Sequence, residues 1–276
     1  MSQTRSLSPL ASAEPWELVA EGYAAEAPFL MRGFSLRAIE LLEPFSSARV
    51  IDVAAGPGTL SLEIAAGVSA VDALDFSAPM LSALDARARE LGIANVRTHV
   101  GDGQALPFPD NEYDLGASIF GLMFFPDRPR GYSELLRVLR PGGRAVVSSW
   151  QPIEESPLVS LMFGAIRVIE PSWPAPKKDP LGLENPDVLA AEMRAAGFGD
   201  VRIVPHTQSL APESASALWT GMARSSAPLV LLRRRLGEEE WARRIPDALA
   251  YLERSLEGGP RELSTTAWLA VGNKPS

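Results

Sequence analysis

The chain has 276 residues, of which 46% are hydrophobic and 22% are charged, a composition typical of a globular protein of one or two domains. Lys and Arg number 26 against 34 Asp and Glu, and the resulting net charge of −8 argues against nucleic acid as a partner. Cysteine is absent and there are two histidines, which excludes disulfides, thiol nucleophiles and histidine-rich metal sites. No apolar run approaches the roughly 20 residues of a membrane span, and the first residues lack the apolar core of a secretory signal. We therefore expect a cytoplasmic protein with no metal centre.

The first 150 residues predict a regular alternation of strands and helices. Short apolar runs predict strands, and apolar residues spaced three and four apart predict helices. Ser77 is a predicted helix N-cap, Gly92 a predicted helix stop, and the Pro-Gly-Gly at 141–143 is expected to end a helix before a strand. The predicted strands are 48–53, 70–75, 96–100, 113–120 and 144–150, and the predicted helices are 59–66, 79–91 and 129–139. Such alternation is typical of a parallel sheet, whose strand-to-helix loops meet at one ligand-binding edge.

The second half of the chain is less regular. Residues 151–186 contain seven prolines around one apolar helix at 158–169, which indicates an inserted cap. The elements predicted after it are a helix at 186–196, a strand at 200–204, a mainly helical stretch at 211–262 and a last strand at 267–271.

Residues at the ends of the predicted strands indicate a nucleoside site. Gly56 and Gly58 allow a sharp turn after the first strand and a close approach of the backbone to a ligand. Asp75 ends the second strand, where an acidic residue can accept hydrogen bonds from both ribose hydroxyls. Asp102 follows the third strand and could accept a hydrogen bond from the exocyclic amine of adenine. The turn lacks the G-x-G-x-x-G spacing and the chain has no P-loop, so a phosphate-bearing ligand fits less well.

Four segments resemble, in order and spacing, the motifs of class I S-adenosylmethionine-dependent methyltransferases. The resemblance is closest to the branch related to ubiquinone and menaquinone biosynthesis methyltransferases. The segments are VIDVAAGPGTLSL (50–62), VDALDFSAPML (71–81), GDGQALPFPDNEYDL (101–115) and LRVLRPGGRAVVSSW (136–150). The resemblance implies an α/β fold with a Rossmann-like, doubly wound, mostly parallel seven-stranded sheet, helices on both faces and a largely helical lid.

We expect a single methyltransferase domain over 1–276, because one sheet begins near residue 48 and ends near residue 271. Its expected parts are an N-terminal helical cover at 1–44, a cofactor-binding core at 45–150 and lid or substrate insertions at 151–186 and 211–262.

The resemblance also assigns roles to single residues. Asp52, Ala54, Gly56 and Gly58 match the loop that approaches the methionyl and adenosyl parts of the cofactor. Asp75 matches the acid that binds the ribose, and Phe76 matches the neighbour that lies against adenine. Asp102 and Gly103 match the residues that contact the edge of adenine. Ser118 is the first residue of 118–121, which matches the segment that lines the methyl-transfer pocket. The family has glycine where Ala54 stands, and we expect alanine to take an ordinary backbone conformation there.

The activity implied is methyl transfer from S-adenosylmethionine to a small-molecule acceptor, with release of S-adenosylhomocysteine. Such an enzyme mainly aligns the reactants and excludes water. An acceptor that must lose a proton needs a base, and His206, just beyond the strand at 200–204, is the catalytic candidate, with a structural role as the alternative. Tyr23 in the N-terminal cover could touch the substrate, although packing is the default for an aromatic residue there.

Aromatic and methionine residues of the insertions suit a partly apolar pocket, or else a helical core. They are Trp150, Met162, Phe163, Trp173, Trp219, Met222 and Trp241. Three other functions stay open: a cyclase or lyase on the same cofactor-binding fold, a non-catalytic member that binds a partner, and an NAD-dependent oxidoreductase, which the glycine spacing disfavours. The sequence also leaves open a homodimer, the identity of the acceptor and the atom that is methylated.

Overall fold

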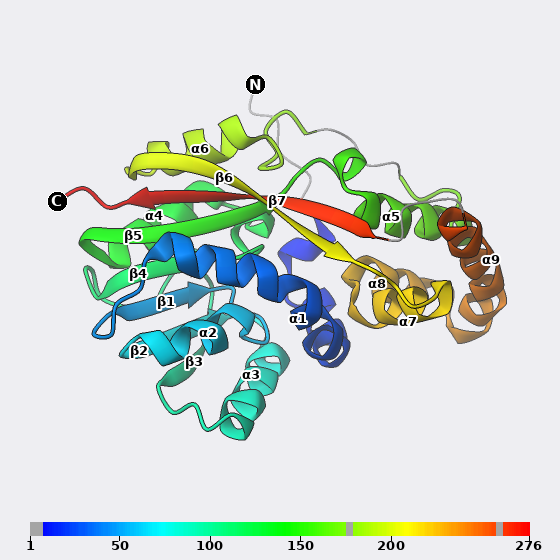
Figure 1. Cartoon of the computed structure of the whole chain (residues 1–276), viewed down its shortest axis with the longest axis horizontal. Coiled ribbons are helices and arrows are strands. Elements are labelled where there is room, and N and C mark those ends of the chain that lie inside the picture. Colours follow the sequence, from blue (N-terminus) through cyan, green and yellow to red (C-terminus); the bar gives the residue numbers. More distant parts are fainter. Residues whose placement is uncertain (1–7, 175–178, 258–261) are drawn as a thin grey trace.

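A seven-stranded sheet forms the centre of the molecule in a computed structural model, which describes residues 8–174, 179–257 and 262–276 (Figure 1). Small parts of the predicted cover and of both insertions, at 1–7, 175–178 and 258–261, lie outside the described residues. The strands are β1 (Arg49–Val53), β2 (Ala70–Asp75), β3 (Val96–Val100), β4 (Tyr113–Ser118), β5 (Leu139–Trp150), β6 (Gly199–Leu210) and β7 (Leu263–Asn273).

The strand order is β3-β2-β1-β4-β5-β7-β6. Strands β1 to β5 are parallel to one another, whereas β7 is antiparallel to both β5 and β6. The predicted doubly wound, mostly parallel sheet is therefore confirmed, and the carboxyl ends of β1 to β5 meet at one edge.

Helices cover both faces of the sheet. On one face lie α1 (Glu14–Leu42), α2 (Thr59–Ile64) and α3 (Ala78–Glu90), and on the other lie α4 (Arg128–Val138) and α6 (Pro186–Ala195) (Figure 1). Two separate apolar clusters fill the space between the layers, one around Phe34 of α1 and one around Tyr132 of α4. Ser77 caps α3 as predicted, because its side chain accepts a hydrogen bond from the N–H of Met80.

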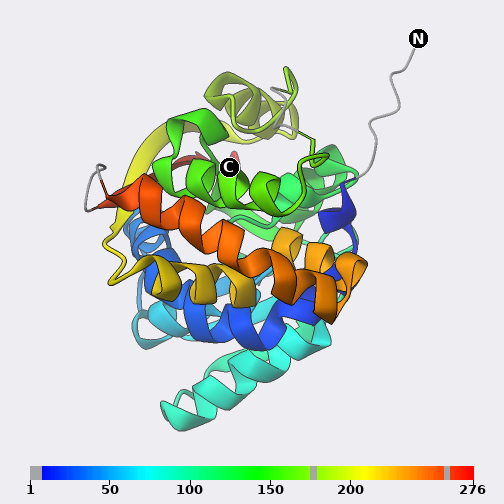
Figure 2. The same cartoon turned by 90° about the vertical axis from the view of Figure 1, so that its right-hand side faces the viewer.

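A second group of helices lies beyond the carboxyl edge of the sheet (Figure 2). It consists of α5 (Pro157–Ile169), α7 (Ala215–Ser225), α8 (Ala227–Leu236) and α9 (Glu238–Leu256). These helices share an apolar cluster of their own, and β6 and β7 extend from the sheet towards them (Figure 1). No helix in the described part of the chain is both long and apolar enough to cross a bilayer.

Four strands differ by more than one residue from the sequence prediction, and the first of them, β4, ends at Ser118 instead of residue 120. Strand β5 begins at Leu139, so 141–143 forms an irregularity within the strand, where pairing with β4 shifts register, and does not separate helix from strand. Gly142 permits this with a φ of +79°. Strands β6 and β7 are longer than predicted, because they pair with each other as far as Leu210 and Leu263.

Candidate functional site

A cavity of about 1000 Å³ lies at the carboxyl edge of the sheet. This volume is at the upper end of the roughly 300–1,000 Å³ usual for a site that holds one ligand. Its walls come from the ends of β1 to β5, from α1 and from α5 and α7 of the second helical group. The sequence-predicted site residues that line it are Asp52, Ala54, Gly56, Asp75, Phe76, Asp102 and Gly103.

The two glycines of the turn after β1 have different surroundings. Both have left-handed backbones, with φ of +56° at Gly56 and +79° at Gly58. A Cβ on Gly58 would lie 2.1 Å from a methyl carbon of Leu84, so this glycine permits close packing of α3. A Cβ on Gly56 would meet no atom within 4 Å, and this glycine lines the cavity. Gly56 therefore presents open backbone to a ligand, whereas Gly58 shapes the turn from behind.

Ala54 has a φ of +59°, so the expectation of an ordinary backbone conformation at this position is wrong. The left-handed conformation costs a residue with a Cβ roughly 1–2 kcal/mol. The neighbouring structure holds it in place, since the N–H of Ala55 donates to the carbonyl of Leu74 at 3.0 Å. Its methyl group occupies space next to Gly121, where a Cβ would lie only 2.3 Å away.

Asp75 is a buried carboxylate with both oxygens held by backbone. Its Oδ2 accepts a hydrogen bond from the N–H of Gly56 and its Oδ1 accepts one from the N–H of Ser77, each at 2.8 Å. Burial raises the pKa of Asp75, and the backbone N–H groups act against that rise. Because a carboxylate has about four acceptor positions, each oxygen can still accept a hydrogen bond from a hydroxyl group of a ligand in the cavity.

Asp52 places a second buried carboxylate in the same wall. Its Oδ2 accepts a hydrogen bond from Ser61 Oγ at 2.7 Å. Burial raises the pKa of Asp52 to about 6. The negative charge of Asp75 also raises this pKa, whereas the hydrogen bond from Ser61 lowers it. Burial and Asp75 also raise the pKa of Tyr23, a cavity-lining residue of α1, to about 12. Two buried carboxylates in one wall favour a ligand with positive charge.

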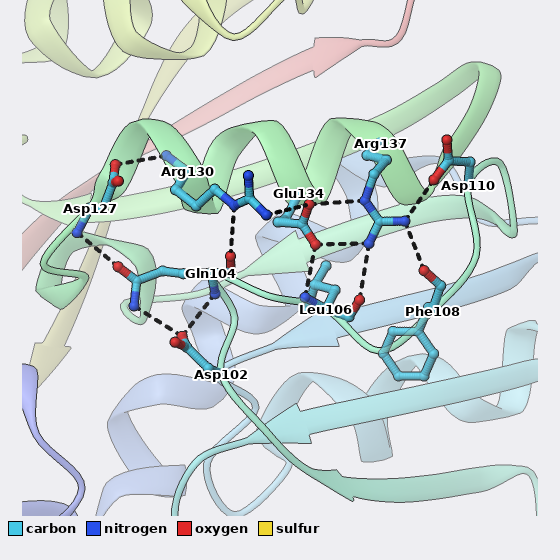
Figure 3. Close-up of polar contacts among 9 residues, drawn as sticks. All are labelled: Asp102, Gln104, Leu106, Phe108, Asp110, Asp127, Arg130, Glu134 and Arg137. Carbon is cyan, nitrogen blue, oxygen red and sulfur yellow. Dashed lines mark hydrogen bonds and ion pairs between the residues drawn. The ribbon is translucent and has the colours of Figure 1, made fainter.

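The loop after β3 adds another hydrogen-bond acceptor to the cavity wall. Asp102 is exposed in the cavity, and its Oδ1 accepts hydrogen bonds from the N–H and from Nε2 of Gln104, at 2.9 and 3.0 Å (Figure 3). Gly103 is buried, and a Cβ there would lie 2.4 Å from Phe125. Phe76, directly after β2, also lines the cavity and is 38% exposed, so its ring is available to a flat ligand.

A pair of aromatic residues that follow or end adjacent strands also lines the cavity. The rings of Phe120 and Trp150 stack with centroids 3.8 Å apart. Phe120 has a φ of +60°, and its N–H donates to Ser148 Oγ at 2.9 Å. Phe120 belongs to 118–121, the segment that the sequence resemblance matches to the methyl-transfer pocket, although Ser118 was the residue named from it.

Comparisons with known proteins place this arrangement in a family. A model of the methyltransferase domain matches residues 50–143. The chain is 35% identical over 183 residues to the demethylmenaquinone methyltransferase of Thermus thermophilus, covering 59% of this chain and 79% of that protein. It is 30% identical over 216 residues to the nocamycin O-methyltransferase of Saccharothrix syringae, covering 72% of this chain and 76% of that protein. The chain belongs to the class I S-adenosylmethionine-dependent methyltransferases.

Within this family, the methyltransferase falls in the branch related to ubiquinone and menaquinone biosynthesis methyltransferases. Its fold is similar to that of the [4+2]-cyclase SpnF, with a TM-score of 0.60 and 17% identity over 99% of both chains. At this identity the likeness concerns the fold alone and does not favour a cyclase.

Three predicted site residues of the methyltransferase lie outside the cavity lining: Gly58, Ser118 and His206. Ser118 is fully buried, and its Oγ accepts a hydrogen bond from the N–H of Leu122 at 3.1 Å, so it shapes the turn after β4. His206 lies inside β6, not beyond the end of a strand as expected from the sequence. Its ring packs edge-on against Phe34 of α1 at 5.6 Å, and burial, followed by nearby Arg37, lowers its pKa. The structure thus does not bring His206 to the predicted cofactor residues.

The aromatic and methionine residues predicted for the insertions divide into two groups. Those that line the cavity are Trp150, Met162, Phe163 and Met222. Trp219 and Trp241 are buried in the helical core, where their rings stack with centroids 5.5 Å apart. Trp173 packs against the same core. Some of these residues therefore line the cavity, whereas others form the helical core.

Proposed function

We propose that this methyltransferase binds S-adenosylmethionine along the ends of β1, β2 and β3. The observation that best supports this is the Asp75 carboxylate, which backbone N–H groups of Gly56 and Ser77 hold rigidly in the cavity wall. In this proposal Asp75 accepts the ribose hydroxyls, Phe76 lies against adenine, and Asp102 and Gly103 contact its edge. Asp52, Ala54 and Gly56 then line the methionyl part, in the loop that Gly58 shapes.

The charges of the wall agree with such a ligand. S-adenosylmethionine bears a positively charged sulfonium, which supplies a methyl group ready for transfer and leaves S-adenosylhomocysteine as the product. The raised pKa values of Asp52 and Asp75 mean that their negative charges are poorly solvated in the fold. A cationic group near them stabilises those charges, and the buried setting strengthens the attraction.

We further propose a small, partly apolar molecule as the methyl acceptor. The cavity is large enough to extend past the cofactor wall towards the stacked rings of Phe120 and Trp150. Five of the seven methionines line it, and flexible thioether side chains adapt to irregular apolar ligands. They are Met31, Met80, Met123, Met162 and Met222. The two relatives described above are named for small-molecule substrates or products, which agrees with this class of acceptor.

The helices beyond the sheet edge act, in this proposal, as a lid within a single domain. Helices α5 and α7 contribute cavity-lining side chains, and Ser156 Oγ before α5 donates to Thr265 Oγ1 of β7 at 2.9 Å. Because β7 lies between β5 and β6, the end of the chain completes the same sheet. Such a lid would exclude water and align the acceptor, which are the main tasks in methyl transfer.

Calorimetric titration with S-adenosylhomocysteine tests the cofactor proposal. We expect binding to the wild type, and a loss of about 2–3 kcal/mol in Asp75→Ala from broken charge-assisted hydrogen bonds. Asp85→Ala is the matched control, since Asp85 lies on α3 outside the cavity lining and bonds Thr98 instead. Failure of the wild type to bind at hundreds of micromolar, or binding of NAD instead, would overturn the proposal.

Methyl-labelled S-adenosylmethionine with fractionated cell extract tests the acceptor proposal. We expect label in a small organic-soluble product, identified by mass spectrometry. Label found only in protein or nucleic acid, or tight cofactor binding with no transfer to any fraction, would contradict it.

A further inference from the structure

Gln104 is the residue that links Asp102 to helix α4 (Figure 3). Its backbone N–H and its Nε2 both donate to Asp102 Oδ1, at 2.9 and 3.0 Å. Its Oε1 accepts a hydrogen bond from the N–H of Asp127, the N-cap of α4, at 2.8 Å. Because a backbone N–H can only donate, this contact orients the amide with its NH₂ group towards Asp102.

The loop that holds Gln104 is fixed to α4 along its whole length. The carbonyl of Gln104 accepts from Arg130 Nε at 3.0 Å. Further along, Glu134 Oε2 accepts from the N–H of Leu106 at 2.9 Å, and Arg137 Nη2 donates to the carbonyl of Leu106 at 3.0 Å. The Arg137 guanidinium lowers the pKa of Glu134, which keeps that carboxylate ionised. The amide of Gln104 therefore extends from a rigid support, although Asp102 itself is exposed.

The two oxygens of Asp102 have different surroundings. Oδ1 has two donors from Gln104, whereas no donor among the described residues reaches Oδ2. Both Asp102 and Gln104 line the cavity. A carboxylate held by one oxygen keeps the other in a fixed direction, ready for a donor on a ligand.

We infer that Gln104 is a positioning residue for adenine: it holds Asp102 so that the free oxygen accepts the exocyclic amine of the cofactor. This inference rests on the proposed binding of S-adenosylmethionine. It makes Gln104 a determinant of selectivity for adenine over a base with a carbonyl at the same position, because a carbonyl can only accept and would face a carboxylate. A purely structural role for Gln104 would not affect that selectivity.

The test compares two ligands in calorimetry: S-adenosylhomocysteine and S-inosylhomocysteine, in which hypoxanthine replaces adenine. The measured quantity is the ratio of their dissociation constants. Gln104→Glu is the most informative variant, because its carboxylate still accepts from the N–H of Asp127 but has no donor for Asp102. Gln104→Ala removes both side-chain contacts, the one with Asp102 and the one with the N–H of Asp127. Asp102→Ala shows the selectivity that remains when the carboxylate is absent. Asp110→Ala is the control, since it breaks a pair of the same loop with Arg137 without touching Asp102.

We expect the wild type to prefer the adenine ligand, and Asp102→Ala to lose that preference. The preference should fall about threefold to tenfold in both Gln104 variants, the effect of one hydrogen bond, and stay unchanged in Asp110→Ala. An unaltered preference in Gln104→Glu, with a collapsed one in Asp102→Ala, would overturn the inference while leaving the proposed function intact. Binding of neither ligand by the wild type would instead overturn the proposed function, and the inference with it.

Discussion

Replacing Asp52 with asparagine should stabilise the fold, and more so at alkaline than at acidic pH. The side chain is 2% exposed, and burial raises its pKa from the ordinary value of 3.8 to about 6. Each pH unit between the two values corresponds to about 1.4 kcal/mol, so the buried charge costs the fold about 3 kcal/mol when fully ionised. Asparagine has nearly the same size, and its oxygen can still accept the hydrogen bond from Ser61.

The sign of the pH effect follows from the direction of the shift. A group whose folded pKa is raised contributes its stability below the unfolded pKa and loses it as the pH rises through the folded pKa. For these two pKa values about half of that cost is present at about pH 5 and nearly all of it at about pH 8. The advantage of Asp52→Asn over the wild type should therefore grow by roughly 1 kcal/mol across this interval.

Urea unfolding followed by circular dichroism, on both proteins at both pH values, measures this difference. Asp85→Asn serves as the control, because its side chain bonds Thr98 outside the cavity. A difference between Asp52→Asn and the wild type that is the same at both pH values would refute the argument.

The negative charge of Asp52 also predicts that affinity for S-adenosylmethionine rises through about pH 6 in the wild type and is less dependent on pH in Asp52→Asn.

Three other substitutions test the packing of the site. Ala54→Gly should stabilise the fold by up to about 1 kcal/mol in urea unfolding, since it relieves a left-handed backbone; a destabilised variant would contradict the strain. Gly58→Ala should cost more than about 1 kcal/mol by the same measurement and weaken cofactor binding, because the new Cβ would meet Leu84; a neutral effect on stability would show that α3 can move away. Arg128→Leu should cost about 3 kcal/mol, because it leaves Glu192 without its partner. Hydrogen exchange should also quicken at 179–184, where Arg128 Nη2 donates to the carbonyl of Leu181 at 2.7 Å; unchanged exchange would exclude Arg128 as the support of that loop.

The cavity wall formed at the ends of β1, β2 and β3 could be predicted from the sequence, because local signals agree there. The predicted strands at 70–75 and 96–100 coincide with β2 and β3, and Gly92 after α3 has the left-handed φ, +68°, that its role as a stop requires. Parallel strands then bring their ends together by topology, so Asp75 and Asp102 share one cavity.

Other parts of the site depend on contacts that no local pattern encodes. Alanine disfavours a left-handed backbone, yet the turn around Ala54 imposes one. Arginine is usually exposed, but Arg128 is 6% exposed because α6 supplies Glu192. The sequence predicted that His206 lies beyond the end of a strand. In the structure β6 continues to Leu210 because it pairs with β7, which lies more than 50 residues later in the chain.

By itself, the sequence determined the order of strands and helices, the family and the residues at the strand ends. The strands and helices follow from periodicity and capping, which act over a few residues, whereas the family follows from the resemblance of four sequence segments to known motifs. Only the tertiary structure decided which carboxylates are buried with raised pKa values, which side chains of the helices beyond the sheet line the cavity, and how Gln104 holds Asp102. The reason is that burial and hydrogen-bond direction depend on neighbours that are distant in the chain and adjacent only in the fold.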